Sequence, residues 1–518
     1  MMMLRELVSA IEPLKVYGDM DKEITGISCD SRKTEKGNLF VAIKGYSKDG
    51  HLYIHDATSR GASAIVIEEF HQSILNQVQD HSRKSTVFIV VPNSRRALAL
   101  LSDRFYNHPS KNLRLIGITG TNGKTTTSYL IRSALHQWGR NVGLLGTVGY
   151  VIDDEIIEAP NTTPESLDLQ RYLSRMVNSG ITHAVVEVSS HALSLNRVDG
   201  CEFDVAVFTN ITRDHIDFHC SIEEYIRAKR MLLGYIKREG FAVINIDDRC
   251  INEFSSTIRG NVLTYGLNEK ADVMARLLPS MKENETTLAI NTPSEGFETS
   301  TTLLGRHNIY NILAATSACV ALGVPLHAIN NGIKSQGCIP GRLEKIDLGQ
   351  DFLCIVDYAH TEDALERLIC TARELITQDS KLQTPNSSPR IITIFGCGGN
   401  RDRGKRPLMG KVASELSDIV IITSDNPRDE EPLEIINEII SGIKGDNYYV
   451  IPDRKEAINY AINCARKGDT VLIAGKGHED YQIIGGKRYP FDDRKVAREM
   501  IKSKCKNQNA KIKIQNDI

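Results

Sequence analysis

The chain has 518 residues, of which 41% are hydrophobic and 25% charged, a balance typical of a folded protein with about three domains. A formal net charge of −2 gives no overall field that would attract a nucleic acid, so we expect no nucleic-acid partner. No stretch approaches the ~18 consecutive apolar residues of a membrane span, no signal peptide is recognisable, and the 11 cysteines show no Cys-x-x-Cys pairs, so we expect free thiols and a cytoplasmic protein without membrane association.

Residues 1–110 are predicted to form a small N-terminal α/β domain. Short apolar runs at 39–43 and 64–67 are separated by turn-forming residues, which is typical of alternating strands and helices. Proline and polar residues at 107–110 interrupt this pattern. We therefore place the first domain boundary there.

Residues 111–339 are predicted to form a central domain with a parallel sheet covered by helices on both faces. Four segments are apolar along most of their length, as buried parallel strands are. They are 113–118, 183–188, 204–209 and 241–246.

A glycine-rich turn follows the first of these strands and leads into a predicted helix. Such a turn points backbone N–H groups at an anion, while Lys124 reaches the β- and γ-phosphates and the Thr125 hydroxyl holds Mg²⁺. The turn departs from the strict P-loop, because Ile118 occupies a glycine position and an extra glycine stands at Gly120. We expect ATP or another nucleoside triphosphate here. The predicted contacts are Gly117, Thr119, Gly120, Thr121, Asn122, Gly123, Lys124, Thr125 and Thr126.

Polar side chains follow the next two central strands. Glu187 ends one strand, and residues 209–215 end the next. Because the carboxyl ends of parallel strands converge on a bound nucleotide, Glu187 is predicted to share Mg²⁺ with Thr125. His215 is a candidate ligand for a second ion, although a single histidine more often satisfies a hydrogen bond in the core.

Residues 340–518 are predicted to form a C-terminal domain with a second doubly wound, Rossmann-like sheet. The strand–helix alternation resumes after Pro340 and Gly341. Its strands are 352–358, 390–395, 418–423 and 470–474. Apolar residues at helical spacing within 365–375 and at Leu433, Ile436, Ile439 and Ile440 predict two buried helix faces. The polar segment 378–389 is predicted to be a surface loop and the basic tail 502–518 a solvated or frayed end.

These features, taken with several ordered motifs, resemble the Mur ligases of peptidoglycan precursor synthesis over nearly the whole chain. The motifs that carry the resemblance are the phosphate turn, residues 187–191, 210–215, 305–311, 341–342 and 357–361. Further motifs are similar to the branch of the family that adds the third residue of the stem peptide, namely 30–32, 396–401, 425–428 and 475–479.

The resemblance implies an ATP-dependent amide ligase with Mg²⁺ as cofactor. It implies that a carboxylate of UDP-N-acetylmuramoyl-L-alanyl-D-glutamate is activated as an acyl phosphate and then attacked by the amine of meso-2,6-diaminopimelate, releasing ADP and phosphate. Both steps concentrate negative charge, which Lys124 and Mg²⁺ would neutralise. An L-lysine-adding enzyme and a folylpolyglutamate synthase-like ligase remain as alternatives. We expect a monomer.

The resemblance also implies roles for individual residues around the nucleotide. Thr125 and Glu187 would bind the first metal ion, and His215 with a carbamate (CO₂) on Lys229 the second. Without the resemblance, Lys229 would be interpreted as a lysine on a helix surface. The implied catalytic residues are Lys124, Glu187, His215 and Lys229, and the residues implied for adenine, triphosphate and ribose are Asn308, Arg342 and Asp357. Arg342 follows the predicted hinge, so domain closure would bring its guanidinium to the phosphates; the alternative is an interdomain ion pair.

Substrate contacts are implied in all three domains. For the uridine diphosphate they are Ser31, Tyr46, Ser47 and Lys48, and for the sugar-peptide Asn161, Thr162, Thr163, Ser189 and Arg197. Two departures from the family pattern are Leu195, where many relatives have glutamine, and Glu362, where relatives often have proline.

The C-terminal motifs imply the choice of amino acid. Arg401 and Arg428 can bind a carboxylate bidentately, while Asp425 and Glu479 can receive an ammonium. Meso-diaminopimelate has both groups at its distal end, whereas L-lysine lacks the carboxylate. The full implied set is Arg401, Asp425, Asn426, Pro427, Arg428, Gly475 and Glu479.

Overall fold

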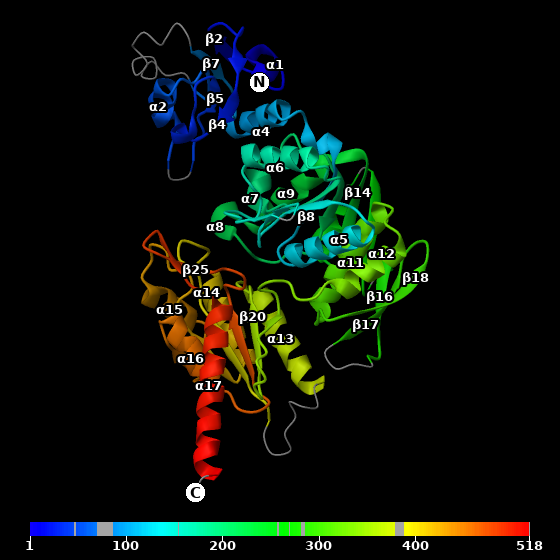
Figure 1. Cartoon of the computed structure of the whole chain (residues 1–518), viewed down its shortest axis with the longest axis vertical. Coiled ribbons are helices and arrows are strands. Elements are labelled where there is room, and N and C mark those ends of the chain that lie inside the picture. The colour runs from blue at the N-terminus through cyan, green and yellow to red at the C-terminus, as the bar shows by residue number, and fades with distance from the viewer. Residues whose placement is uncertain are drawn as a thin grey trace.

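The computed structural model describes residues 1–45, 48–69, 86–153, 155–255, 258, 260–268, 270–280, 285–378 and 388–516. Tyr46 and Ser47, and most of the predicted loop 378–389, lie outside the described residues. The chain forms three α/β units that follow one another from the N-terminus to the C-terminus (Figure 1). The predicted three-domain α/β class is confirmed, and within the described part no helix is both long and apolar enough to cross a membrane.

The N-terminal unit is built on a five-stranded sheet in the order β2-β7-β6-β5-β4. Its strands are parallel except β2, which pairs antiparallel with β7. The strands are β2 Lys15–Tyr17, β4 Gly26–Ser28, β5 Asn38–Val41, β6 Ala64–Ile67 and β7 Val87–Val90, with a small separate pair of β1 Met2–Met3 and β3 Glu23–Ile24. The helices are α1 Leu4–Val8, α2 Ile54–Ser59 and α4 Ser94–Phe105.

The central unit contains an eleven-stranded sheet in the order β11-β10-β9-β12-β8-β13-β14-β15-β16-β17-β18. The seven strands from β9 to β16 are parallel, but both ends carry antiparallel strands, so the expectation of a purely parallel sheet was incomplete. The parallel strands are β8 Arg114–Thr119, β9 Val142–Leu145, β12 His183–Glu187, β13 Phe203–Phe208, β14 Ile236–Asn245, β15 Asn261–Gly266 and β16 Val273–Leu278. The antiparallel ones are β10 Tyr150–Ile152, β11 Glu155–Ile157, β17 Thr286–Asn291 and β18 Gly296–Thr301.

Helices cover both faces of this sheet, as predicted. Alternate residues of β8 enter opposite cores: Ile116 packs with α5, α11 and α12, whereas Leu115 packs with the side of α6, α7 and α9. The bounds are α5 Lys124–Gln137, α6 Ser166–Asn178, α7 Ser190–Ser194, α8 Ile216–His219, α9 Ile222–Arg230, α10 Arg249–Ser255, α11 Arg306–Ala321 and α12 Leu326–Ser335.

The C-terminal unit has a six-stranded sheet in the order β19-β20-β24-β21-β22-β23, parallel except for β19. Its strands are β19 Glu344–Lys345, β20 Leu353–Asp357, β21 Ile391–Phe395, β22 Ile419–Ile422, β23 Tyr448–Val450 and β24 Thr470–Ala474, followed by the hairpin β25 Tyr481–Ile484 and β26 Lys487–Pro490. Helices α13 Glu362–Gln378, α14 Lys405–Leu416 and α15 Pro432–Ile440 lie on one face, and α16 Arg454–Cys464 and α17 Asp493–Asn516 on the other.

Two details of this unit differ from the sequence prediction. Leu433 is 55% exposed, and the buried face of α15 consists of Ile435, Ile436 and Ile439. The basic tail continues as helix α17 to Asn516 and does not begin as a frayed end. Near its start, the Lys504 ammonium donates to the carbonyl oxygen of Ile462 at 2.7 Å, which attaches α17 to α16.

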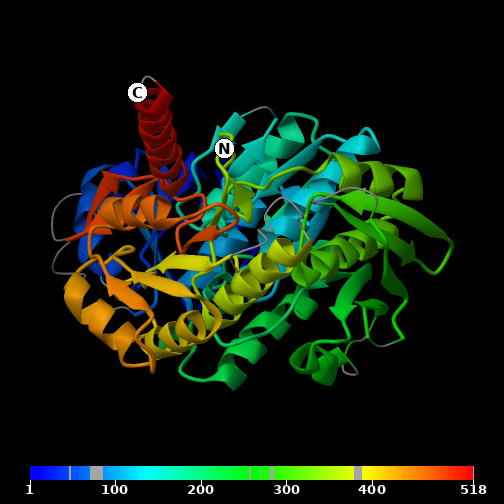
Figure 2. The same cartoon turned by 90° about the horizontal axis from the view of Figure 1, so that it is seen from below.

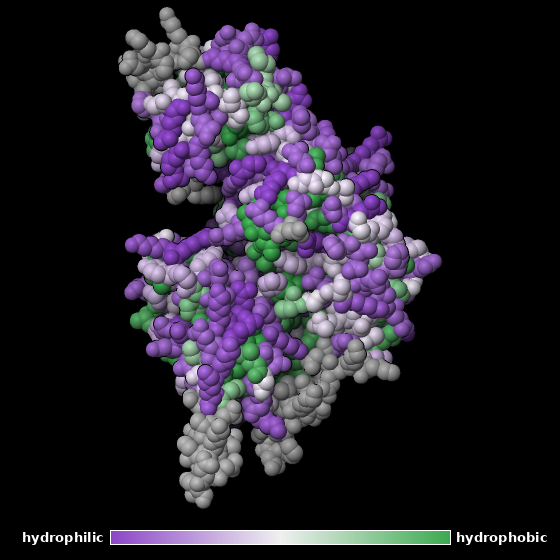
Figure 3. Space-filling view, viewed as in Figure 1, coloured by the Kyte–Doolittle hydropathy of each residue, from purple (hydrophilic) through white to green (hydrophobic). Residues whose placement is uncertain are grey.

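The C-terminal unit lies against the central unit (Figure 2). Asn122 Nδ2 donates to Asp363 Oδ2 at 2.8 Å, and Arg488 pairs with Glu158 at 2.6 Å. On the other side of the central unit, α4 of the first unit packs along α6. The space-filling view shows a largely hydrophilic surface with a notch between the N-terminal and C-terminal units (Figure 3).

Candidate active site

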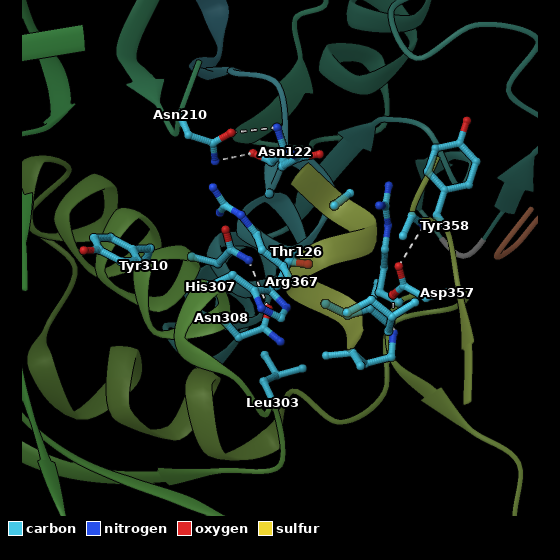
Figure 4. Close-up of a pocket in the computed structure, with 18 of the residues that line it drawn as sticks. Asn122, Thr126, Asn210, Leu303, His307, Asn308, Tyr310, Asp357, Tyr358 and Arg367 are labelled. Atoms are coloured by element: carbon cyan, nitrogen blue, oxygen red, sulfur yellow. Dashed lines mark hydrogen bonds between the residues drawn. The ribbon is translucent and has the colours of Figure 1, made fainter. Parts of the chain in front are cut away.

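The phosphate turn joins β8 to α5 and is shaped by contacts with the end of β13. Gly120 and Gly123 have positive φ of 147° and 87°, where a side chain would be strained. A Cβ on Gly120 would lie 1.8 Å from Thr209 Oγ1, so the glycine that departs from the strict P-loop is required by close packing. Asn210 fixes the turn, because its Oδ1 accepts from the Asn122 N–H at 3.0 Å and its Nδ2 donates to the Asn122 carbonyl at 3.0 Å (Figure 4).

Lys124 and Lys229 both donate to the same carbonyl oxygen of this turn. Lys124 Nζ lies 2.8 Å from the Gly120 oxygen and 2.9 Å from that of Thr121, and Lys229 Nζ lies 2.8 Å from the Gly120 oxygen. Lys229 is 2% exposed, so its interpretation as a surface lysine is wrong. Its ammonium also lies 4.4 Å from the centre of the Tyr225 ring, and among the described residues it has no carboxylate at ion-pair distance.

Burial changes the charge state of these amines. It lowers the pKa of Lys229 well below its ordinary value, and the neighbouring Lys124 lowers it further. Burial also lowers the pKa of Lys124, although the carboxylates of Glu187 and Asp214 oppose this effect. Lys229 is therefore the more readily deprotonated of two amines held at one carbonyl.

Glu187 ends β12 as a fully buried carboxylate. It accepts from the Thr125 hydroxyl at 3.0 Å, the Thr147 hydroxyl at 2.8 Å and the Thr147 N–H at 3.1 Å. No ammonium or guanidinium of the described residues forms an ion pair with it. A buried carboxylate without a cation, beside a threonine hydroxyl, fits the oxygen ligands that Mg²⁺ prefers.

His215 follows β13 with a positive φ of 56°, and its Nε2 lies 3.2 Å from Asp214 Oδ2. Burial lowers the pKa of His215 to about 3 despite the Asp214 carboxylate, so the imidazole is neutral and able to bind a metal. Nowhere in the described part do three His, Cys, Asp or Glu side chains gather to hold an ion. A second ion at His215 would thus need a ligand of another kind.

A first cavity, of about 230 Å³, lies between the central and C-terminal units (Figure 4). Asn308 from α11, Asp357 from the end of β20, and Arg342 line it. The Asp357 carboxylate accepts from the N–H groups of Leu343 and Ala359 at 2.7 and 2.8 Å, which ties the segment after the hinge to β20. Arg342 Nη2 donates to the Thr125 hydroxyl at 3.2 Å, so this guanidinium already reaches the phosphate turn. Arg342 forms no ion pair with the residues that the structure describes.

A second cavity, of about 450 Å³, opens beside the phosphate turn and is lined by both units. It brings together residues that are up to 360 positions apart in the chain, from Thr121 to Tyr481. Those predicted from the sequence are Thr121, Asn122, Gly123, Lys124, Thr125, Asn161, Thr162, Ser189, His215, Arg342, Arg401, Asp425, Asn426, Arg428, Gly475 and Glu479.

The C-terminal wall of this cavity is a network around Lys476, which is fully buried. Its ammonium donates to Glu479 Oε2 at 2.9 Å and to Asn426 Oδ1 at 3.1 Å, and Asn426 Nδ2 donates to the same Glu479 oxygen at 2.9 Å. Burial would raise the pKa of Asp425, but the charges of Lys476 and Arg454 hold it below its usual value, so the carboxylate is ionised. Gly475, with φ of 114°, leaves space for Asp425, whose Oδ2 would lie 2.8 Å from a Cβ there.

Two guanidiniums complete this wall. Arg428 Nη1 donates to the Gly399 carbonyl at 2.7 Å, and Arg401 Nη1 to the Asn400 carbonyl at 3.0 Å. Burial, followed by the charge of Arg401, lowers the pKa of Arg428. Neither has a carboxylate at ion-pair distance among the described residues, so the two remain available to an anion.

Comparison with known proteins decides the family. Family models match residues 23–106 (Mur ligase family, catalytic domain), 118–319 (Mur ligase middle domain) and 341–477 (Mur ligase, glutamate ligase domain). The chain is 44% identical over 513 residues to a protein of Bacillus cereus named UDP-N-acetylmuramoyl-L-alanyl-D-glutamate–2,6-diaminopimelate ligase, covering 98% of this chain and 100% of that one. The chain belongs to the Mur ligase family.

Other similarities agree with this membership. A protein of the same name from Caldanaerobacter subterraneus is 43% identical, covering 96% of this Mur ligase and 98% of its own length. A solved structure of an enzyme of that name matches with a TM-score of 0.64 and 32% identity over 96% of this chain and 99% of that one. A folylpolyglutamate synthase of Mycobacterium tuberculosis matches with a TM-score of 0.58 and 15% identity over 74% of this chain and 92% of its own, which shows a shared fold.

Several residues predicted for the site of this Mur ligase do not line the second cavity. Glu187 and Lys229 are buried beneath it, and Gly117 and Thr119 lie within β8. Thr126 and Asn308 belong to the first cavity, and Pro427 lines neither of the two. Ser31 and Lys48 lie in the N-terminal unit, apart from both.

Arg197 has partners that the sequence did not suggest. It pairs with Glu165 at 2.5 Å and donates to the Thr163 carbonyl at 3.0 Å. Thr163 Oγ1 in turn donates to the Glu187 carbonyl at 2.7 Å and accepts from the Ser189 N–H at 3.0 Å. In this structure Arg197 and Thr163 therefore hold the loop 161–165 in place, and Asn161 and Thr162 face the cavity. Leu195 caps the end of α7 and takes no polar role.

Sequence reasoning missed other residues that line the cavities. In the first cavity these are His307, Tyr310 and Arg367, and in the second Thr147, His360, Lys405, His478 and Tyr481. His307, His360 and His478 stand inside motifs that were recognised, so they could have been selected. Arg367 and Lys405 have no local signal, because each is a cation on an ordinary amphipathic helix.

Proposed function

We propose that this Mur ligase is an ATP-dependent enzyme that joins meso-2,6-diaminopimelate to UDP-N-acetylmuramoyl-L-alanyl-D-glutamate in peptidoglycan precursor synthesis. The observation that carries the proposal is the cavity in which the phosphate turn faces Arg401, Asp425 and Arg428. It would bring an activated carboxylate and a dicarboxylic diamino acid to one place. The names of the relatives, which are identical to this chain at 41–44% of positions, support the same reaction.

ATP would lie across the first cavity with its phosphates on the turn 120–125. Bound ATP would supply the phosphoryl group that activates the substrate carboxylate. Lys124 and the backbone N–H groups of the turn would bind the phosphates, and Arg342 would neutralise charge from the C-terminal side. Asn308 and Asp357 line the same cavity at positions suited to adenine and ribose, although the Asn308 amide already bonds Leu304 and Asn311.

Thr125 and Glu187 would hold the first Mg²⁺, since an uncompensated buried carboxylate and a hydroxyl 3.0 Å apart fit a divalent cation. His215 and Lys229 would hold a second ion once Lys229 carries a carbamate. Carbamylation requires a neutral amine, and two features of Lys229 favour one: burial lowers its pKa, and no carboxylate of the described residues lies at ion-pair distance. The modification would turn a buried amine into an anionic oxygen ligand near two cationic groups.

The diamino acid would bind against the C-terminal wall. Arg401 and Arg428 would receive its distal carboxylate, and Asp425 and Glu479 its distal ammonium. L-lysine would leave two guanidiniums without an anion, a loss of roughly 1–3 kcal/mol or more for charged groups. The enzyme would therefore prefer meso-diaminopimelate.

The remaining parts of the proposal concern the UDP-linked dipeptide, the domain limits, the oligomeric state and the location in the cell. Ser31 and Lys48, with Tyr46 and Ser47, would bind the uridine diphosphate, and Asn161, Thr162, Thr163, Ser189 and Arg197 the sugar-peptide. We further propose domain limits at residues 110 and 339, a monomer, and a cytoplasmic location in keeping with 11 unpaired cysteines, all of them within the described residues.

The test is a ligation assay with purified protein, ATP, Mg²⁺ and the UDP-linked dipeptide, run in parallel with meso-diaminopimelate and with L-lysine. We expect ADP and a tripeptide product that depend on all three reactants, with meso-diaminopimelate used at least about tenfold faster at equal low concentration. Faster use of lysine would overturn the amino-acid assignment. ATP hydrolysis that ignores the other two reactants would overturn the ligase itself.

A further inference from the structure

Lys405 is a buried lysine of the second cavity for which the described residues provide no partner. It is the first residue of α14, it is 7% exposed, and it lines the second cavity. Among the described residues, no carboxylate or carbonyl oxygen forms an ion pair or hydrogen bond with its ammonium. Because Lys405 lines the cavity without a fixed acceptor among the described residues, its ammonium is available to an anion that binds there.

The other lysines near the cavity have partners. Lys476 is bound by Glu479 and Asn426, and Lys124 and Lys229 each donate to a carbonyl of the phosphate turn. The neighbouring Arg406 forms ion pairs with Glu430 and Glu438, each at 2.9 Å. The absence of a partner is thus particular to Lys405 within this part of the described structure.

The position of Lys405 indicates which anion it would meet. The start of α14 lies against the segment 210–215, on the phosphate side of the cavity: Arg213 Nε lies 3.8 Å from Asp402 Oδ2, and a Cβ on Gly404 would lie 2.6 Å from Arg213 Nη2. The charges that act most on Asp425 and Arg428 come from Lys476, Arg454 and Arg401, not from Lys405. Lys405 therefore lies closer to the phosphate centre than to the site of the distal carboxylate.

We propose that Lys405 is a catalytic residue whose ammonium binds the phosphoryl oxygens while the phosphate passes from ATP to the substrate carboxylate and then leaves. This inference rests on the proposed ligase function. It adds a cation delivered by the C-terminal unit, opposite Lys124 of the central unit, so the migrating phosphate is neutralised from both sides. Helix α14 adds the positive end of its dipole at the same point.

The test compares Lys405→Met, which removes the charge at similar volume, with Lys405→Arg, which keeps it. Lys411→Met is the matched control, because Lys411 lies on the same helix and is exposed. We expect Lys405→Met to lower kcat by about 10²-fold while the KM for the diamino acid changes by less than about threefold. The arginine variant should recover about tenfold of this loss, and Lys411→Met should match the unmodified enzyme.

Product inhibition identifies the anion. Inorganic phosphate should inhibit Lys405→Met about tenfold less strongly than the unmodified enzyme, while inhibition by ADP stays the same. A raised KM for the diamino acid with unchanged kcat would overturn the proposal and assign Lys405 to an amino-acid carboxylate. Unchanged kcat and unchanged phosphate inhibition would overturn it altogether.

Two further variants test whether Lys405 has only a structural role. Glu362 has a buried Oε2 without a partner, and the Lys405 charge acts on it, so Lys405 could serve only to compensate that acid. Glu362→Gln should leave phosphate inhibition unchanged, and an equal loss in this variant would overturn the proposal. If thermal unfolding shows that Lys405→Met does not fold, Lys405→Gln takes its place. Failure of the unmodified enzyme to form product would count against the proposed function, whereas failure confined to these variants would count against Lys405 alone.

Discussion

Lys229 of the central unit and Lys476 of the C-terminal unit are both buried lysines beside the same cavity, but their surroundings are opposite. Lys476 is enclosed by a carboxylate and an amide oxygen, so it is compensated and fixed. Lys229 has a carbonyl oxygen and an aromatic ring but, among the described residues, no carboxylate at ion-pair distance, and burial lowers its pKa. The difference teaches that burial alone does not define a reactive lysine: the missing carboxylate does, because it leaves the neutral amine as the favoured form.

The largest effect should come from removing the uncompensated amine. Lys229→Ala is expected to lower the ligation rate by about 10³-fold, because the second ion would lose its anionic ligand. Short-chain carboxylates such as formate or acetate should restore part of the activity by filling the same space. Arg227→Ala, an exposed cation on the same helix, is the control. A Lys229→Ala enzyme with an unchanged ligation rate would show that Lys229 is not needed for the reaction.

Removing the compensated amine should damage structure more than chemistry. Lys476→Met leaves Glu479 without its cation, so we expect the free energy of local opening of residues 475–484 to fall by about 3 kcal/mol. Hydrogen exchange measures this directly, since the Ile483 N–H donates to Asn426 Oδ1 in the same network. Exposed Lys487→Met should leave exchange unaltered. If Lys476→Met and the unmodified protein show equal protection from hydrogen exchange, Lys476 does not stabilise the network.

The two guanidiniums on the C-terminal wall are an intermediate case, because Arg428 is half-buried, Arg401 is exposed, and neither has a carboxylate at ion-pair distance among the described residues. Arg428→Lys keeps the charge and a comparable backbone strain at φ of 55°, but it loses the planar fork. We expect kcat/KM for meso-diaminopimelate to fall by roughly 10- to 100-fold, with a far smaller change for L-lysine. An equal fall in kcat/KM for both amino acids would show that Arg428 does not bind the distal carboxylate.

The smallest effect should appear in stability against pH. Between the lowered folded-state pKa of Lys229 and its ordinary value of 10.5, the unfolded chain binds a proton that the folded protein does not. The stability of the unmodified protein therefore rises with pH over that interval, whereas this contribution is absent from Lys229→Met. In CO₂-free buffer the variant should have the higher Tm near pH 7, and the difference should shrink toward pH 10. A Tm difference independent of pH would show that Lys229 stays charged in the folded protein.

Much of the site was predictable because its chemistry lies in short local patterns. Glycine at 120 and 123, Lys124 and Thr125 follow a strand and begin a helix, and this order alone indicates a phosphate turn. The C-terminal arginines were found instead through short motifs that resemble those of the Mur ligases. In contrast, Arg197 was expected to face the substrate, yet it pairs with Glu165 and Thr163, because the neighbours of a long side chain depend on how the loops fold together.

The sequence by itself determined the three α/β units, four strands of each large sheet and the phosphate turn, because hydrophobic patterns and glycine positions act over a few residues. It determined neither the antiparallel ends of the central sheet nor the burial of Lys229, and it gave no sign of Lys405. Those features were decided by the tertiary structure, because they depend on which segments, distant in the sequence, pack against one another and exclude water. A lysine on a helix has the same sequence whether it faces solvent or a closed cavity, and only the packing of two domains sets its charge and its partner.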